Sequence, residues 1–312
     1  MNKPREPGWL TYGGAGDRYA GAREQLRQAE AHLKTLQGHA ADLTELAQAW
    51  YRVGRARSYA LHLPPGRRFA SAHEAMRNAV DIGERVGDIA QRARWWSGLG
   101  TALKNLVTDP DDPTAHELNL EEALKAHAKA VELAKESSDH ELLAAVLSAA
   151  ALAYHYRDQG ERRDNIDRAV ALLTEAIGWR LQLGQHAEAA IAATTCGIVW
   201  ASHPDSSLGL DRAMSCYDLA RRHLNTDHYP AHARRLGRSA GHAALRQGKW
   251  DAAAGWYALA WAGVRLAMSR ASDAIDRRNE LAEYGDASSR HVYALARAGP
   301  WLKPLHWLTS TP

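Results

Sequence analysis

The sequence of 312 residues has little of what marks a secreted, membrane-spanning or β-rich protein. It contains one phenylalanine and two cysteines, and it lacks the runs of β-branched and aromatic residues that predict strands. No apolar run approaches the roughly 20 residues of a transmembrane helix. Lys3 and Arg5 are not followed by an apolar segment, so we expect no secretory signal. Two cysteines make no disulfide framework, and we expect a cytoplasmic location.

A strong excess of charge of one sign is also missing. The 39 basic and 36 acidic residues give a formal net charge of +3. Acidic and basic residues are interspersed along the chain, whereas nucleic-acid binding needs a concentrated basic stripe. We therefore expect neither nucleic acid nor a membrane as a partner.

Alanine, leucine and arginine are abundant, which favours helices. One pattern recurs: an apolar or aromatic residue, an alanine three positions later, a large residue four further on, and a second alanine after three more. These spacings place all four positions on one face of a helix. The copies are Tyr19-Ala22-Leu26-Ala29, Phe69-Ala72-Met76-Ala79, Leu120-Ala123-His127-Ala130, Ile166-Ala169-Leu173-Ala176, Leu210-Ala213-Tyr217-Ala220 and Trp250-Ala253-Tyr257-Ala260. The third copy departs from the others by having a histidine at the large position.

A second motif lies between these copies and pairs a large apolar residue with a glycine. It reads Trp50-x-x-Val53-Gly54 and Trp96-x-x-Leu99-Gly100, and later copies keep Gly197 and Gly241. Glycine inside a helix costs about 0.5–1 kcal/mol relative to alanine. Its recurrence therefore predicts that a partner helix packs directly against the backbone there. Of the neighbours Trp95 and Trp96, we expect Trp96 to take the core position.

Together the two motifs resemble the tetratricopeptide (TPR) repeat, W-x2-L-G-x2-Y followed by A-x3-F. The distance from Gly241 to Ala253 is that of a minimal helix–turn–helix unit of this family. The resemblance implies an all-α fold, a right-handed superhelical solenoid of antiparallel helix pairs. A single pair cannot bury its apolar face alone, so neighbours stack around a continuous core. We expect a lead-in over residues 1–16, a repeat domain over 17–299 and a tail over 300–312.

A narrower resemblance concerns the stretches from Arg163 to Val170 and from Lys249 to Gly299. They are similar to the repeats found upstream of CHAT domains, which are caspase-like peptidases of bacteria. Here Pro300 follows Gly299 at once, and proline breaks helices. We expect a CHAT-associated repeat protein without the peptidase domain.

The TPR resemblance implies a concave surface lined mainly by the first helix of each pair. Aromatic residues with arginine are typical of binding hot spots. The residues predicted to face this groove and contact a partner are Tyr51, Arg55, Tyr59, Arg94, Ser97, Thr101, Lys104, Asn105, His155, Tyr156, Arg235, Arg238 and His242. Some TPR domains grip a C-terminal carboxylate with a Lys/Asn clamp, but the equivalent places here hold Tyr51, Arg55, Ser97 and Thr101.

Candidates for chemistry are few. Cys196 and Cys216 fall at helical repeat positions, where free cysteine acts as a small buried hydrophobe. A turn gathers His223, Asp227, His228 and His232, but Pro230 interrupts the spacing that a zinc site would need. We expect no catalytic residue, no metal and no cofactor.

Our hypothesis is a protein–protein interaction scaffold or regulator that binds a peptide or protein in the concave groove, and not an enzyme. The alternative is the substrate-recognition part of a split or truncated CHAT-type cysteine peptidase. Self-association is a further alternative, because the last repeat has no successor to cover its apolar surface.

Overall fold

The computed structural model describes residues 17–38, 42–60, 63–106, 113–271, 277–278, 281 and 284–298, except for the side chains of residues 17–22, 65 and 113. These parts contain helices and no strand, so the all-α prediction is confirmed. The predicted lead-in and tail, residues 1–16 and 300–312, lie outside them. The chain divides into two compact units, Met1–Ala192 and Ala193–Pro312. The single repeat domain over 17–299 stays a prediction.

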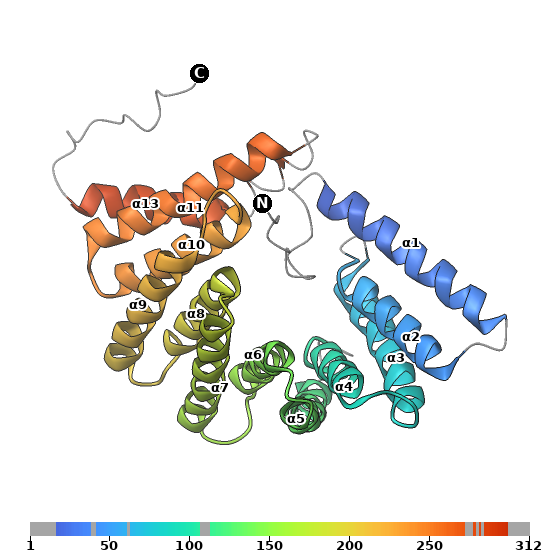
Figure 1. Cartoon of the computed structure of the whole chain (residues 1–312). Helices are drawn as coiled ribbons and strands as arrows, with labels where there is room; N and C mark the ends of the chain where they lie inside the picture. The colour runs from blue at the N-terminus through green and yellow to red at the C-terminus, as the bar shows by residue number, and fades with distance from the viewer. Residues whose placement is uncertain are drawn as a thin grey trace. The chain divides into compact units, whose positions relative to one another are not determined.

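Helices of similar length follow one another along both units (Figure 1). The first unit contains α1 (Asp17–Gln37), α2 (Leu43–Ser58), α3 (Pro65–Gly83), α4 (Ile89–Lys104), α5 (Pro113–Glu136), α6 (His140–Tyr156) and α7 (Arg162–Gln182). Helix α8 (His186–Trp200) spans the boundary, and the second unit continues with α9 (Ser206–His223), α10 (Pro230–Arg246), α11 (Trp250–Arg270) and α13 (Gly285–Ala298). None of the described helices combines the length and the apolar character needed to cross a bilayer.

The helices of the first unit pack in pairs: α2 with α3, α4 with α5, and α6 with α7. The two helices of a pair run in opposite directions (Figure 1). Contacts of α3 with α4 and of α5 with α6 join one pair to the next, and α1 packs on α2. In the second unit α10 packs on α11, and α9 and α13 join this pair. The predicted antiparallel helix pairs are therefore confirmed within each unit.

An aspartate fixes the start of each first helix in the first unit. Asp42 accepts hydrogen bonds from the backbone N–H groups of Thr44 and Glu45 at the start of α2. Asp88 forms a capping box with Gln91 at the start of α4, and Asp139 caps α6 in the same manner. These carboxylates satisfy backbone donors that a helix cannot pair internally. They set where each first helix begins.

The repeated alanines are the deepest positions of the fold. Every alanine of the second to sixth copies is fully buried: Ala72, Ala79, Ala123, Ala130, Ala169, Ala176, Ala213, Ala220, Ala253 and Ala260. In the first copy Leu26 and Ala29 are half-buried, and the side chains of Tyr19 and Ala22 lie outside the described part. The predicted register is confirmed from α3 to α11.

The large residue of the pattern, which we call the anchor, lies against the glycine of the preceding first helix. A Cβ placed on Gly54 would lie 2.9 Å from Cγ of the anchor Met76, and one on Gly197 would lie 2.3 Å from Cε1 of the anchor Tyr217. Gly100 with His127 and Gly241 with Tyr257 repeat the arrangement. Glycine is needed because an anchor side chain, rather than the partner backbone, occupies the place of its Cβ.

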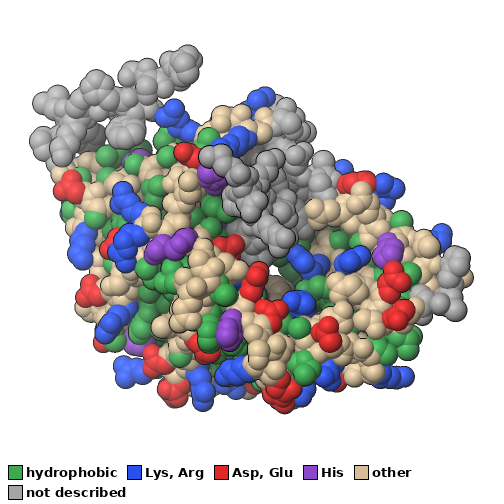
Figure 2. All heavy atoms as spheres, in the orientation of Figure 1, with side chains coloured by type: hydrophobic (Ala, Val, Ile, Leu, Met, Phe, Trp, Pro, Cys, Tyr) green, Lys and Arg blue, Asp and Glu red, His purple; other side chains and the backbone are tan. Residues whose placement is uncertain are grey.

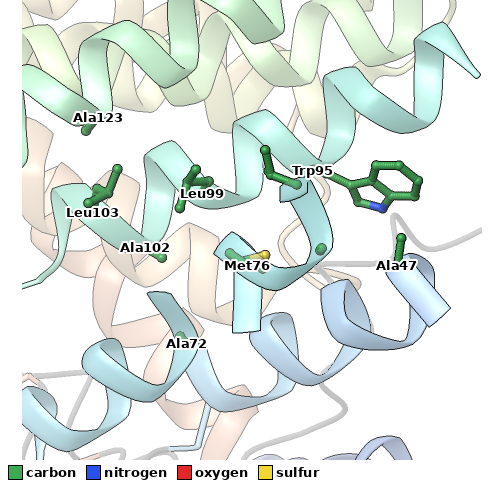
Figure 3. Packing of buried hydrophobic residues seen from close by; sticks show 10 residues of the cluster. Ala47, Ala72, Met76, Trp95, Leu99, Ala102, Leu103 and Ala123 are labelled. Carbon is green, nitrogen blue, oxygen red and sulfur yellow. The ribbon is translucent and has the colours of Figure 1, made fainter. Parts of the chain in front are cut away.

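The core tryptophan of α4 is Trp95, so the expectation that Trp96 takes the core position is wrong. Trp95 is 1% exposed, whereas Trp96 is half-buried. The Trp95 indole fits because Gly83, the last residue of α3, and Gly87, in the turn that follows, have no side chains. A Cβ on Gly83 would lie 2.0 Å from the Trp95 ring. Figure 3 shows Trp95 near Ala47, in the cluster that also holds Met76.

Helices α10 and α11 of the second unit approach each other closely. A Cβ on Gly237 would lie 2.5 Å from the backbone nitrogen of Ala260, and one on Gly263 would lie 2.5 Å from the carbonyl oxygen of Pro230. Each glycine therefore allows the partner backbone to approach. Gly255, also on α11, faces open space, with nothing within 4 Å of a Cβ.

These surroundings predict opposite effects for the same substitution. Gly237→Ala forces α10 away from α11 and should lower the free energy of unfolding by about 1–3 kcal/mol. Gly255→Ala meets no neighbour and should raise it by about 0.5–1 kcal/mol, since alanine favours the helix. Urea denaturation followed by circular dichroism measures both. Equal effects of the two variants would contradict this packing.

Candidate functional site

Three predicted first helices lie next to one another in the first unit. Helix α2 contacts α4, and α4 contacts α6, in addition to their contacts with the second helices. The first-helix face, as we name it, is the surface of these helices that carries Tyr51, Arg55, Thr101, Lys104 and Tyr156. It brings residues from three repeats within reach of one another.

Tyr51 ties α2 to α4 at this face. A Cβ on Gly98 of α4 would lie 2.9 Å from Cε2 of Tyr51. The guanidinium of Arg55 lies 5.9 Å from the centre of the Tyr51 ring. Burial raises the pKa of Tyr51, while the charges of Arg55 and Arg94 oppose that shift. Tyr59 follows as the C-cap of α2 and is 40% exposed.

Arg94 has a structural partner. Its Nη2 lies 3.0 Å from Oδ2 of Asp139, the aspartate that caps α6 through the N–H of Leu142. The ion pair links the second turn of α4 to the N-cap of α6. Ser97 is half-buried further along α4. Arg94 therefore has a structural role, because it joins α4 to α6. Its contact with a partner stays a prediction from the sequence.

Lys104 lies at the end of α4 beside the end of α6. Its Nζ donates a hydrogen bond to Oδ1 of Asn105 at 3.0 Å, and Nδ2 of Asn105 donates to the carbonyl oxygen of Thr101 at 2.8 Å. The Lys104 Nζ also lies 5.1 Å from the centre of the Tyr156 ring. Burial lowers the pKa of Lys104 to about 8. No carboxylate of the described residues forms an ion pair with it.

A neutral histidine and a further cation lie beside this lysine. His155 stacks edge-on against Tyr156, with ring centres 4.9 Å apart, and Arg162 at the start of α7 donates a hydrogen bond to the His155 carbonyl oxygen. Burial, followed by the charges of Arg162 and Lys104, lowers the pKa of His155 to about 4. Nearby Glu121 is already paired with Arg157, at 2.6 Å.

His127, the one histidine among the anchors, lies on the inner side of the same region. It is 1% exposed, and neither of its ring nitrogens has a hydrogen-bond partner among the described residues. A Cβ on Gly100, one turn before Lys104, would lie 2.8 Å from its Nε2. Burial, followed by the charge of Lys104, lowers the pKa of His127 to about 3.

We call Lys104, His127, His155, Tyr156 and Arg162 the basic–aromatic cluster. Basic and acidic side chains are mixed on the face seen in Figure 2, whereas no acidic residue belongs to this cluster. Such a cluster can accept a carboxylate by ion pairing and present Tyr156, which is 52% exposed, as an apolar contact. Within the described parts, no three His, Cys, Asp or Glu side chains gather as a metal site would require.

The remaining predicted residues lie on α10 in the second unit and form a separate group. Arg235 is exposed, and Arg238 and His242 are half-buried. The His242 ring packs edge-on against Tyr257, with centres 5.6 Å apart. Burial, followed by the charge of Arg290, lowers the pKa of His242. His242 therefore faces the anchor of its own helix pair.

Comparison with known proteins supports the arrangement of helices. No family model matches the chain, and no curated protein does. The chain is similar to the crystal structure of BtubC (BKLC) from P. vanneervenii, with a TM-score of 0.51, 17% identity, and coverage of 86% of this chain and 91% of that one. The fold is TPR-like. A Rap protein complexed with Competence and Sporulation Factor matches at a TM-score of 0.47 and 12% identity, over 90% of this chain and 74% of that one.

Within the TPR-like frame, two members of the cluster were not predicted as site residues. Arg162 belongs to a second helix, which the resemblance places outside the groove, and no signal in the sequence marks it. His127 did carry a signal, because it puts a polar ring at an anchor position that is apolar or aromatic in the other copies. The sequence could have marked it as a site residue on that ground.

The buried histidine predicts a pH-dependent stability. The folded protein keeps His127 neutral down to about pH 3, whereas the unfolded chain protonates it below about pH 6.5. Between pH 7.5 and 5.5 the wild type should therefore lose about 1.4 kcal/mol relative to His127→Met. Methionine is a matched replacement because Met76 is the anchor of an earlier pair. Urea denaturation at both pH values measures the difference, and parallel losses in both proteins would contradict it.

Proposed function

We propose that this chain is a protein–protein interaction scaffold or regulator whose first-helix face binds an acidic segment of a protein or peptide partner. The observation that carries the proposal is Lys104, a half-buried ammonium group for which no described carboxylate acts as a counter-ion. Binding rather than catalysis fits the cluster, since it offers cations and an aromatic ring but no paired nucleophile and base.

Desolvation explains why a carboxylate is the expected ligand group. Removing an ammonium from water without an ionic partner is unfavourable, and the lowered pKa of Lys104 reflects that burial. An approaching carboxylate restores the missing interaction through a charge-assisted hydrogen bond. The positive charge of Arg162, which also acts on the neighbouring His155, raises the local potential.

Exposed aromatic rings supply the apolar part of the proposed contact. Tyr59 and Tyr156 end α2 and α6 with 40% and 52% of their surfaces exposed. Rings of this kind bury much area at little cost in side-chain entropy, which is why they recur at binding hot spots. An acidic residue flanked by an apolar residue would use both Lys104 and Tyr156.

Four further points of the sequence-based hypothesis are also proposals: the superhelical groove, the location, the kinship with CHAT-associated repeats and the alternative functions. A right-handed superhelical arrangement, a cytoplasmic location and a contact of a partner with Arg235, Arg238 and His242 are further proposals that rest on the sequence. The kinship with bacterial CHAT-associated repeats is proposed from the sequence alone. The alternative, the recognition part of a split CHAT-type peptidase, would use the first-helix face. Self-association would use the apolar surface of the last repeat, and no specific observation favours either.

Removal of one charge tests the proposal. Short random peptides displayed on phage, selected on the wild-type chain, should be enriched in Asp and Glu. Lys104→Met keeps the methylene stem and removes the ammonium, so it should weaken the selected peptides by about 10- to 100-fold. Fluorescence anisotropy measures the dissociation constants, which should rise with added salt.

The matched control is Lys125→Met on α5, an exposed lysine paired with Glu122 at 2.7 Å. It makes the same change in net charge away from the first-helix face and should leave affinity unchanged. Equal losses from Lys104→Met and Lys125→Met, or selected peptides without an acidic excess, would remove the proposal.

A further inference from the structure

Two thiols meet between α8 and α9. The sulfur atoms of Cys196 and Cys216 lie 3.5 Å apart, although the residues are 20 positions apart in the sequence. Both residues belong to the second unit. Cys196 is 2% exposed, and Cys216 is half-buried. The sequence predicts two separate structural fillers, whereas the structure places them in direct contact.

Packing on either side holds the two sulfurs in place. Gly197, next to Cys196, receives the ring of Tyr217, next to Cys216, with 2.3 Å between a Cβ on Gly197 and Cε1 of Tyr217. Arg246 of α10 donates hydrogen bonds to the carbonyl oxygen of Ala201 at 2.7 Å and to Oγ of Ser206 at 3.1 Å. These contacts fix the end of α8 and the start of α9, so the thiols stay adjacent while the unit is folded.

The two thiols differ in their surroundings. The hydrogen bond with Cys196, aided by the charge of Arg212, lowers the pKa of Cys216. The same hydrogen bond and burial raise the pKa of Cys196. Thiolate character and access both mark the more reactive cysteine of a pair. We therefore expect an oxidant to react first with Cys216. Cys196 is the buried thiol beside it and would react in the second step.

We propose that Cys216 and Cys196 form a reversible redox modification site, at which a hydroperoxide links α8 to α9 through an intramolecular disulfide. The Cys216 thiolate attacks one peroxide oxygen, the O–O bond breaks, and Cys216 becomes a sulfenic acid while the peroxide is reduced to water. The Cys196 sulfur then attacks the Cys216 sulfur. The S–S bond forms, the S–O bond breaks, and the departing hydroxide takes up the Cys196 proton as water. Overall, two thiols and one hydrogen peroxide give one disulfide and two waters.

The two sulfur atoms already lie close to bonding distance. A disulfide needs an S–S distance of about 2.05 Å, so the sulfurs must approach by roughly 1.5 Å, a movement within the range of side-chain rotation. The bond would close a loop that contains the α8–α9 turn and limit the freedom of the unfolded chain. It should therefore stabilise the second unit, independently of any partner at the first-helix face.

Mass spectrometry of the full chain tests the site. Hydrogen peroxide at neutral pH should convert the wild type to a monomeric species that has lost two hydrogens and has no thiol left to label. Dithiothreitol should restore both thiols. The oxidised protein should melt several degrees above the reduced protein.

Variants assign the two roles. Cys196→Ala should let peroxide carry Cys216 on to the sulfinic acid, whereas Cys216→Ser should leave Cys196 reduced; both should lose the rise in Tm. The wild-type masses alone can overturn the proposal. Two free thiols after peroxide treatment, oxygen added to Cys216 with Cys196 still free, or disulfide-linked dimers in place of the monomer would each do so.

Discussion

The fold depends on one contact that recurs from pair to pair: a large anchor side chain of the second helix set against a glycine of the first. Met76 on Gly54 and Tyr217 on Gly197 are two examples. The glycine lowers helix stability by about 0.5–1 kcal/mol, and burial of an apolar anchor, at about 1.5–3 kcal/mol, more than offsets this cost. Because the anchor fills the place of a Cβ, it also fixes the offset of the two helices along their axes.

Periodicity made this frame predictable. The spacing of alanines and anchors lies within one helix, where 3.6 residues per turn decides which positions share a face. Ala123, Ala169 and Ala253 were therefore assigned to the core from sequence alone, and all three are fully buried. The burial of Trp95 is not predictable in this way, because it depends on Gly83 at the end of α3 and on Gly87 in the turn that follows.

The candidate site shows the same limit of sequence reasoning. Lys104 and Tyr156 were predicted to face a groove, but their approach to 5.1 Å follows from how α4 and α6 are offset, which no pattern within either helix encodes. Arg162 enters from α7 for the same reason. The meeting of Cys196 with Cys216 likewise depends on the register between two helices. The structure is therefore needed to find contacts between helices, which patterns within a single helix do not predict.

The side chain at the anchor position differs between helix pairs, and one of these differences lies next to the proposed binding site. Met76 and Leu173 fill their places with apolar atoms, whereas His127 buries two ring nitrogens that have no partner among the described residues. The Tyr257 hydroxyl also has no partner among the described residues, but it is His127 that lies close enough to the half-buried Lys104 to sense its charge. Both His127 and Tyr257 bury polar atoms at a position that is apolar in other copies, and this burial costs free energy of folding. Departures from the local sequence pattern of a fold are expected at functional sites. Here the departure is a buried histidine at an anchor position, and it lies next to Lys104, the cation that we propose binds the partner.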